Sequence, residues 1–279
     1  MKLKKFTAFT FMGIFLLFTL LTVYIFIEPF LLVNKEDTII DPDLPPAFDN
    51  FKIVFISDIH HGPYFSRSRV KQLVSRINDI EPDLILLGGD YVHRHPRYIK
   101  SCFEELAKLQ ADYGVWGVLG NHDHWEGKKL SLAYMDSAGI EVLDNAGFWI
   151  VNNEDSIRLG GVGDMWEDRQ DLTELLDKVN SDHFVILISH NPDFAEYLHT
   201  DLVDLMLCGH THGGQITFFN LWAPILPSEF GQKYRSGRIE TSSTTIIVSN
   251  GVGTITPPVR FCCPPQINII TLKIPSYRQ

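Results

Sequence analysis

Five short apolar runs in this chain each end in a block of polar residues that combines Asp, His or Asn with Gly or Ser. The first two runs, 53–56 and 84–87, consist of β-branched, aromatic and large aliphatic residues, as buried strands do. Between them, apolar residues recur at helical spacing from Val70 to Ile80. A chain that alternates buried strands with such helices is restricted to a layered α/β fold, and we expect two packed sheets flanked by helices.

The same alternation continues through the rest of the chain, without an internal repeat or a low-complexity tract. We expect helices around 98–110 and near 171–179. Further strands are expected at 115–119, 157–162, 184–188, 205–207, 244–249 and 267–272.

The polar blocks combine carboxylate, imidazole and amide side chains. Ligands of open α/β sheets collect at the carboxyl ends of the strands, where these blocks lie. The mixture suits borderline divalent cations such as Mn, Fe, Co or Zn, and two such ions about 3.5–4 Å apart can promote displacement at phosphorus. A single His at a strand end is usually structural, but five such blocks in succession favour a metal site. The Asp, His and Asn residues of these blocks are Asp58, His60, Asp90, Asn121, His122, Asp123, His124, His190, Asn191, His210 and His212.

In order and composition, the five blocks resemble the signature of calcineurin-like metallophosphoesterases over about residues 51–272. The resemblance implies a four-layer α-β-β-α sandwich of two mixed sheets and hydrolysis of phosphate esters at two divalent metal ions. It implies that Asp58, His60 and His212 hold the first metal, that Asn121, His190 and His210 hold the second, and that Asp90 bridges both. A bridging hydroxide would attack phosphorus. His122 would act as acid or orienting donor at the leaving-group oxygen, with Asp123 fixing its tautomer.

Several features together resemble one bacterial branch of membrane-associated phosphodiesterases, some of them linked to hydrolysis of UDP-2,3-diacylglucosamine. These features are the apolar N-terminus, Asp90-Tyr91 and the segments 209–215 and 258–265. A lipid-type phosphate ester is therefore the expected substrate. A soluble nucleotide or other small phosphate ester, a non-catalytic metal-binding scaffold and a nuclease remain alternatives. The formal net charge of −10 disfavours nucleic acid as a partner.

Residues 6–27 carry no charge and are long enough, at roughly 1.5 Å per residue, for one membrane-spanning helix. Lys2, Lys4 and Lys5 precede the run and predict a cytoplasmic N-terminus, with the catalytic domain on the extracytoplasmic side. A cleaved signal peptide is the alternative, although no small-residue cleavage site follows. We thus expect an anchor at 1–33, a linker containing proline at 34–50 and the catalytic domain at 51–279.

Other residues give weaker signals. His61 and His124 are expected to be neighbours of the site, and the cluster of His93, Arg94, His95 and Arg97 to be a solvated loop or a phosphate contact. Asp164 and Trp166 are candidates for the pocket wall, and Arg260 for a phosphate contact or an ion pair. The apolar segment 216–227 is expected to pack on the core or to form a flap that contacts an acyl chain or the membrane. The four cysteines, Cys102, Cys208, Cys262 and Cys263, are expected to be free thiols.

Overall fold

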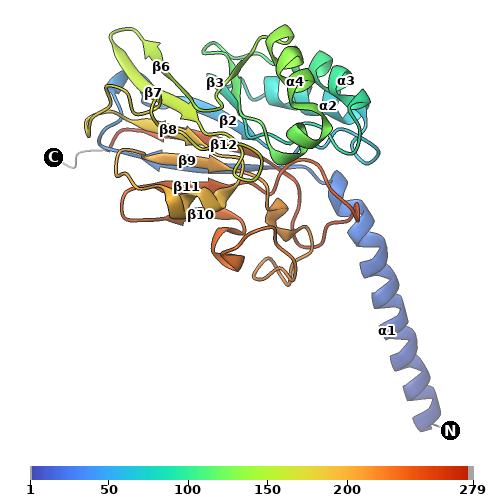
Figure 1. Cartoon of the computed structure of the whole chain (residues 1–279). Helices are drawn as coiled ribbons and strands as arrows, with labels where there is room; N and C mark the ends of the chain where they lie inside the picture. Colours follow the sequence, from blue (N-terminus) through green and yellow to red (C-terminus); the bar gives the residue numbers. More distant parts are fainter. Residues whose placement is uncertain (1, 276–279) are drawn as a thin grey trace.

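Two six-stranded sheets pack face to face in the computed structural model, which describes residues 2–275 (Figure 1). The first sheet has the order β1 (Val33–Ile40), β12 (Gln266–Lys273), β2 (Lys52–Ile56), β3 (Leu84–Leu87), β4 (Val115–Gly117) and β5 (Ile140–Val142). The second has the order β10 (Gly237–Glu240), β11 (Thr245–Val248), β9 (Leu205–Cys208), β8 (Val185–Ile188), β7 (Asp155–Gly161) and β6 (Ala146–Asn152).

Both sheets are mixed, as the resemblance implied. Strands β2, β3, β4 and β5 run parallel, and β12 is antiparallel to β2 but parallel to β1. In the second sheet, β7, β8, β9 and β11 run parallel, with antiparallel β6 and β10 at the edges. The parallel strands therefore end at a common edge, and their polar blocks follow there.

The central strands are buried on both faces, which explains why they read as unbroken apolar runs. In β2, Ile53 and Phe55 join the core between the sheets, whereas Val54 and Ile56 face the helices. In β8 and β9, alternate residues likewise divide between the inter-sheet core and the outer face of the second sheet.

Three α-helices cover the outer face of the first sheet: α2 (Arg67–Asn78), α3 (Arg97–Leu106) and α4 (Asn121–Ser137). Helix α2 begins where Oγ of its N-cap Ser66 accepts the N–H of Arg69 at 3.4 Å, and it buries the apolar stripe that the sequence indicated. We did not expect α4, which begins within the third polar block. Its first turn is formed by site residues, so the apolar spacing that marks a helix starts too late to reveal it.

The outer face of the second sheet is covered by turns and short 3₁₀ helices, among them η3 (Pro192–Tyr197) and η5 (Gly231–Tyr234). The helix expected near 171–179 is not formed. The guanidinium of Arg158 donates hydrogen bonds to the carbonyl oxygens of Glu174 and Leu175. A continuing helix would need these oxygens as acceptors for its own backbone N–H groups.

The linker expected at 34–50 is also wrong. Residues 33–40 form β1, which lies at the edge of the first sheet. Its charged and exposed residues, such as Lys35 and Glu36, are typical of an edge strand, and for that reason the apolar pattern of a strand is absent from the sequence. Phe48 follows in the inter-sheet core, fully buried. The folded domain therefore begins near residue 33 instead of residue 51.

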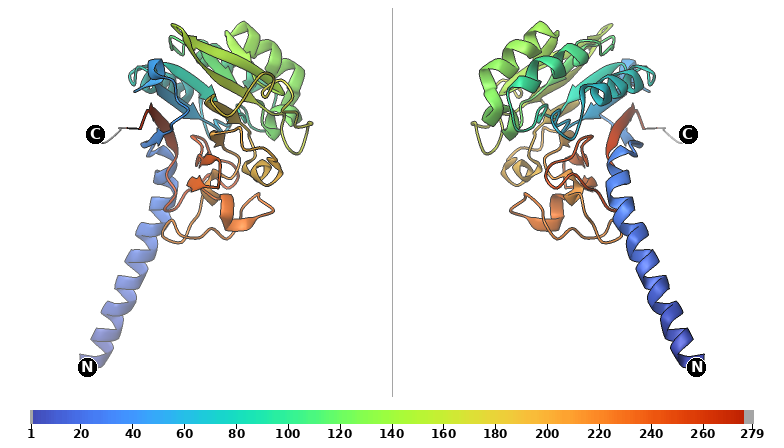
Figure 2. Two further views of the ribbon diagram at one scale, coloured as in Figure 1. Left: turned by 90° about the vertical axis from the view of Figure 1, so that its left-hand side faces the viewer. Right: turned by 90° about the vertical axis from the view of Figure 1, so that its right-hand side faces the viewer.

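Helix α1 (Lys2–Ile27) projects away from the sheets as a single rod (Figures 1 and 2). The stretch Phe9–Phe30 is long and apolar enough to cross a membrane, and its most apolar 18-residue window is not buried in the domain. Glu28 and Pro29, at the end of the stretch, are buried. Only the end of the helix contacts the domain, where the carbonyl of Ile25 accepts the N–H of Arg260 at 3.0 Å.

Candidate metal centre

Seven buried polar side chains meet where five strands end, and none of them is more than 5% exposed. Asp58 and His60 follow β2, Asp90 follows β3, Asn121 opens α4 after β4, His190 follows β8, and His210 and His212 follow β9. The structure thus brings together all seven residues that the sequence nominated as metal ligands.

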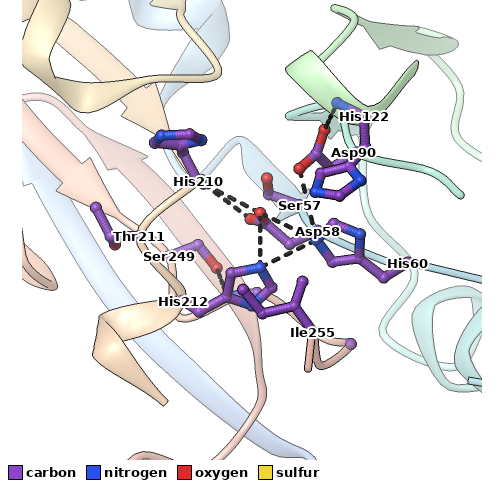
Figure 3. A network of polar contacts seen from close by, with 12 residues as sticks. Ser57, Asp58, His60, Asp90, His122, His210, Thr211, His212, Ser249 and Ile255 are labelled. Atoms are coloured by element: carbon purple, nitrogen blue, oxygen red, sulfur yellow. Dashed lines mark hydrogen bonds and ion pairs between the residues drawn. The ribbon is translucent and has the colours of Figure 1, made fainter. Parts of the chain in front are cut away.

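The first group of donor atoms comes from the two strands β2 and β9. Nε2 of His212 lies 3.0 Å from Nε2 of His60 and 3.3 Å from Oδ1 of Asp58. Figure 3 shows the Asp58 carboxylate between the side chains of His60 and His212, where it also accepts the backbone N–H of His210 at 3.0 Å.

The second group lies beside the first. Nδ1 of His210 is 3.2 Å from Nε2 of His190 and 3.1 Å from Oδ1 of Asn121. Nδ1 of His190 contacts the carbonyl oxygen of Gly88 at 2.6 Å, so its Nε2 is the nitrogen free to bind a cation.

Asp90 stands between the two groups. Its Oδ2 is 3.5 Å from Nε2 of His60 in the first group and 3.4 Å from Nε2 of His190 in the second. Its other oxygen, Oδ1, accepts the backbone N–H of His122 at 2.8 Å. One oxygen of this carboxylate therefore faces both groups at nearly equal distance.

The donor set fits two dications. Among residues 2–275, no Lys or Arg lies within ion-pair distance of Asp58 or Asp90, although both carboxylates are buried. The imidazole nitrogens of His60 and His212 lie 3.0 Å apart in the first group, and those of His190 and His210 lie 3.2 Å apart in the second. A cation shared by the two nitrogens would make each of these contacts favourable. Two divalent ions would also supply the positive charge that the buried carboxylates lack.

The pKa values reflect the same shortage of cations. Burial raises the pKa of Asp58 to about 6 and lowers the pKa of His60 well below its ordinary value. Burial also opposes protonation of His190, but the adjacent carboxylates of Asp90 and Asp58 outweigh it and raise the pKa of His190. A proton on His190 therefore occupies the place that a metal ion would take.

The backbone at these positions is unusual. Asp58, His60, Asp90, His210 and His212 all have φ between 47° and 68°, in the left-handed region that such residues rarely adopt. Gly209 permits the close approach of β9 to β2, since a Cβ there would lie 1.9 Å from Oγ of Ser57. Strained backbone of this kind persists where the surrounding structure dictates it, commonly at functional sites.

His122 lines the cavity beside the two groups, but Asp123 does not contact its imidazole, contrary to our expectation. Oδ2 of Asp123 accepts the N–H groups of Asp90 (2.8 Å) and Gly120 (2.9 Å), and Oδ1 accepts that of Tyr91 (3.0 Å). Consecutive residues in a helical turn point in different directions, so Asp123 turns inward to join two loops while His122 faces the cavity.

The neighbour of the His122 imidazole is His93, whose Nδ1 lies 3.5 Å from Nδ1 of His122. Burial lowers the pKa of His93 to about 4. The sequence placed His93 only in a basic cluster, because its distance from residue 122 along the chain gave no sign of this contact.

Of the other residues singled out in the sequence, some lie apart from the seven-residue group and others lie at the cavity. His61 is structural, with Nδ1 2.7 Å from the carbonyl of Phe65, and His124 lies outside the seven-residue group. Trp166 lies on the cavity wall, with its ring centre 4.5 Å from that of His210, while Asp164 accepts the N–H of Trp166 at 2.9 Å.

Arg260 lines neither cavity at the site, and among residues 2–275 it forms no ion pair with a carboxylate. It is fully buried, and its guanidinium donates to the carbonyls of Asn250, Gly253 and Cys263 at 2.7 to 2.9 Å. Its role is to hold together the loops behind the site.

Two adjoining cavities open at the site. The first, about 220 Å³, is lined by five of the seven metal-ligand candidates, all but Asp58 and His190, together with His122, Trp125 and Trp166. The second, about 140 Å³, is lined mainly by apolar residues that include Ile216, Pro224 and Ile225. His212, Pro227 and Ile255 line both, so the polar site continues into an apolar pocket.

Comparison with known proteins identifies the family of this chain. Residues 51–214 match the calcineurin-like phosphoesterase family. The chain is 34% identical to the uncharacterized metallophosphoesterase YkuE of Bacillus subtilis, over 89% of this chain and 88% of YkuE. It is 32% identical to the phosphodiesterase YaeI of Escherichia coli, over 80% of this chain and 82% of YaeI.

A solved structure supports the fold alone. The NAD nucleotidase NadN of Haemophilus influenzae superimposes with a TM-score of 0.50 at 14% identity, covering 72% of this chain and 45% of NadN.

Proposed function

Because the chain belongs to the calcineurin-like phosphoesterase family, whose members are phosphoester hydrolases that use two divalent metals, we propose that its seven buried donors are the metal ligands. Asp58, His60 and His212 hold one ion in this proposal. Asn121, His190 and His210 hold the other, and Asp90 bridges the two. The observation that carries the assignment is the position of Asp90 Oδ2, at 3.5 and 3.4 Å from one imidazole nitrogen of each group.

The two carboxylates and the neutral ligands leave an excess charge of about +2 on a dimetal site, which attracts a phosphate ester. When bound, the metals supply the activated water and neutralise charge on phosphorus-bound oxygens. The protein orients the ester: the half-exposed Trp125 and Trp166 line the cavity, and His122, which also lines it, would face the bound ester. We assign His122 the donation of a proton to the leaving-group oxygen, with His93 as the residue that orients its ring.

We further propose that α1 anchors the enzyme in a membrane, with the catalytic domain on the extracytoplasmic side. The apolar stretch Phe9–Phe30 is long enough to cross a bilayer, and apart from its end at Glu28 and Pro29 it is not buried by the domain. The lysines that precede it support a cytoplasmic N-terminus.

The substrate that this arrangement favours is an amphiphilic phosphodiester or pyrophosphate, such as a phospholipid or UDP-2,3-diacylglucosamine. The apolar cavity that shares Pro227 and Ile255 with the metal cavity supports it, because it offers an apolar site beside the phosphate. A precursor made on the cytoplasmic face would be out of reach of an extracytoplasmic domain, which favours a phospholipid. A soluble nucleotide is the second candidate, for which the small metal cavity suffices.

Hydrolysis by the purified full chain tests this function. We expect turnover of bis(p-nitrophenyl) phosphate that EDTA abolishes and Mn²⁺ or Zn²⁺ restores, with about two metal ions per chain. Metal binding without turnover under any of these ions would instead indicate a scaffold. A phospholipid and a short-chain analogue with the same headgroup, assayed in parallel, separate the two substrate classes.

A further inference from the structure

A loop beside the metal site exposes an unusual number of large apolar side chains. Within residues 216–226, which we name the aromatic loop, Phe218, Phe219, Leu221 and Ile225 are 68 to 80% exposed, and Trp222 is 50% exposed. The loop contains no charged residue, although 21% of the chain is charged. Such a surface is unfavourable in water and marks a contact with an apolar partner.

The aromatic loop is tied to the segment that holds α1. Thr217 donates its N–H to the carbonyl of Phe261 at 2.9 Å, and Phe261 donates to the carbonyl of Gln215 at 2.8 Å. The ring of Phe261 in turn packs edge-on against Tyr24 of α1, with ring centres 6.1 Å apart.

A buried carboxylate strengthens this junction. Glu28, only 1% exposed, follows α1 directly and accepts the backbone N–H groups of Cys262 at 2.9 Å and Cys263 at 2.6 Å. Together with the Ile25–Arg260 hydrogen bond, these contacts fix the end of the helix to the strand-like segment that supports the aromatic loop. The helix and the loop are therefore joined through the same segment, residues 260–263.

This connection places the loop near the helix. The lower, orange-coloured loops form the end of the domain toward which α1 projects, at the level of the C-terminal part of that helix (Figures 1 and 2). The sheets and helices α2, α3 and α4 lie on the opposite side.

We propose that the aromatic loop is a second membrane contact, which inserts into the lipid leaflet that α1 leaves. The proposal rests on the proposed anchoring by α1. Phe, Leu, Ile and Trp are the side chains that enter the boundary between headgroups and acyl chains, and the loop presents them without a charge. The loop is thereby a docking surface for a bilayer. The contacts of Glu28 with the segment that supports the loop would set how far the loop enters the bilayer.

Docking of the loop orients the site. Ile216 and Ile225 belong both to the loop and to the wall of the apolar cavity, which adjoins the metal cavity. An amphiphile can then move from the leaflet along the loop, keeping its apolar part in lipid or protein while its phosphate reaches Asp90 and His122.

Tryptophan fluorescence tests the contact. The chain has five tryptophans, at 116, 125, 149, 166 and 222, and α1 contains none, so quenching by brominated phosphatidylcholine reports on the domain alone. In vesicles that contain the full chain, we expect brominated lipid to quench the emission and Trp222→Phe to remove most of that quenching. Trp149→Phe, in β6 and far from α1, is the matched control and should leave the quenching unchanged.

A second variant guards against a purely structural effect of Trp222. Phe219→Ser and Leu221→Ser together leave Trp222 in place but should reduce its quenching several-fold, with flotation on vesicles retained through α1. Equal quenching in wild type, Trp222→Phe and Trp149→Phe, or none in wild type, would overturn docking of the loop.

The outcomes separate this proposal from the proposed function. A chain that fails to float with vesicles overturns anchoring and docking together. A chain that floats and hydrolyses bis(p-nitrophenyl) phosphate, but shows no quenching through Trp222, overturns docking alone. Quenching without hydrolysis supports docking and overturns the enzyme mechanism.

Discussion

The backbone N–H of His122 donates a 2.8 Å hydrogen bond to Oδ1 of Asp90. This bond fixes the Asp90 carboxylate so that Oδ2 faces both groups of metal-ligand candidates. It also sets the start of α4, from which the His122 side chain reaches the cavity. One contact thus couples the bridging position to the residue assigned to proton transfer.

Asp90→Asn should disturb both metal positions, because the amide keeps the shape but loses the bridging charge. We expect the metal content to fall to about one ion per chain or less and turnover to drop by at least about 100-fold. Elemental analysis and hydrolysis of bis(p-nitrophenyl) phosphate measure the two effects. Asp144→Asn, which alters another shielded carboxylate away from the site, is the control; equal losses in both variants would contradict the bridging role.

His122→Ala should leave the metal content nearly unchanged while it lowers kcat by about 10²–10⁴-fold, the usual contribution of a positioned acid or base. Substrates with a good leaving group such as p-nitrophenolate need less protonation, so the loss should be larger for an alkyl ester. Equal losses for both esters would argue against proton transfer by His122.

Asp123→Asn tests the corrected role of that residue. An amide has one oxygen to accept hydrogen bonds, whereas the carboxylate accepts three backbone N–H groups from two loops. Leaving one or two of them unpaired should lower the free energy of unfolding by about 1–3 kcal/mol each and reduce the melting temperature. The pH dependence of the remaining activity should keep its shape, which it would not do if Asp123 governed the His122 tautomer.

Asp144 should make stability depend on pH. Burial raises its pKa to about 7, and its Oδ2 is shielded without a hydrogen-bond partner. The folded state therefore binds this proton more tightly than the unfolded state, so Asp144 costs nothing below about pH 4 and its cost grows as pH rises to about 7. After allowance for partial solvent screening, Asp144→Asn should stabilise the protein by about 2 kcal/mol at pH 8 and hardly at all at pH 4, as denaturant titration would show. A pH-independent effect would contradict the assignment.

The effect of removing the proposed anchor on stability should depend on where the chain is cut. Deleting residues 1–23 keeps Glu28 and β1 and should release a soluble domain that hydrolyses small esters as the full chain does. Deleting residues 1–34 removes Glu28 and leaves the N–H groups of Cys262 and Cys263 unpaired, which should cost about 1–3 kcal/mol for each group. We expect a lower melting temperature for the deletion of residues 1–34 than for the deletion of residues 1–23. Equal melting temperatures would mean that the contacts of Glu28 add no stability.

Much of the fold was predictable because its central strands are buried on both faces. Such strands read as unbroken apolar runs, and the polar residues at their ends converge once the strands are parallel, as Asp58, Asp90 and His190 do. The edge strand β1 was missed because one side faces solvent and carries Lys35 and Glu36.

Contacts between distant segments were beyond the reach of the sequence. Asp123 looked like a partner of His122 because it is adjacent in the chain, but its direction depends on the turn that opens α4. His93 and Arg260 owe their contacts to loops that are distant in the sequence and meet only in the folded structure. Nothing in the sequence near an Arg shows whether its side chain will bind carbonyl oxygens or a phosphate.

Strand β12 lies between β1 and β2, and its Gln266 pairs with Val33 near the other end of the described chain. During translation, α1 and β1 leave the ribosome long before residue 266 has been made. The first sheet cannot close until then, so the apolar helix is complete while the domain behind it is still unfolded. With α1 as the proposed anchor, insertion would precede folding, and the domain would acquire its structure while already tethered at the bilayer surface.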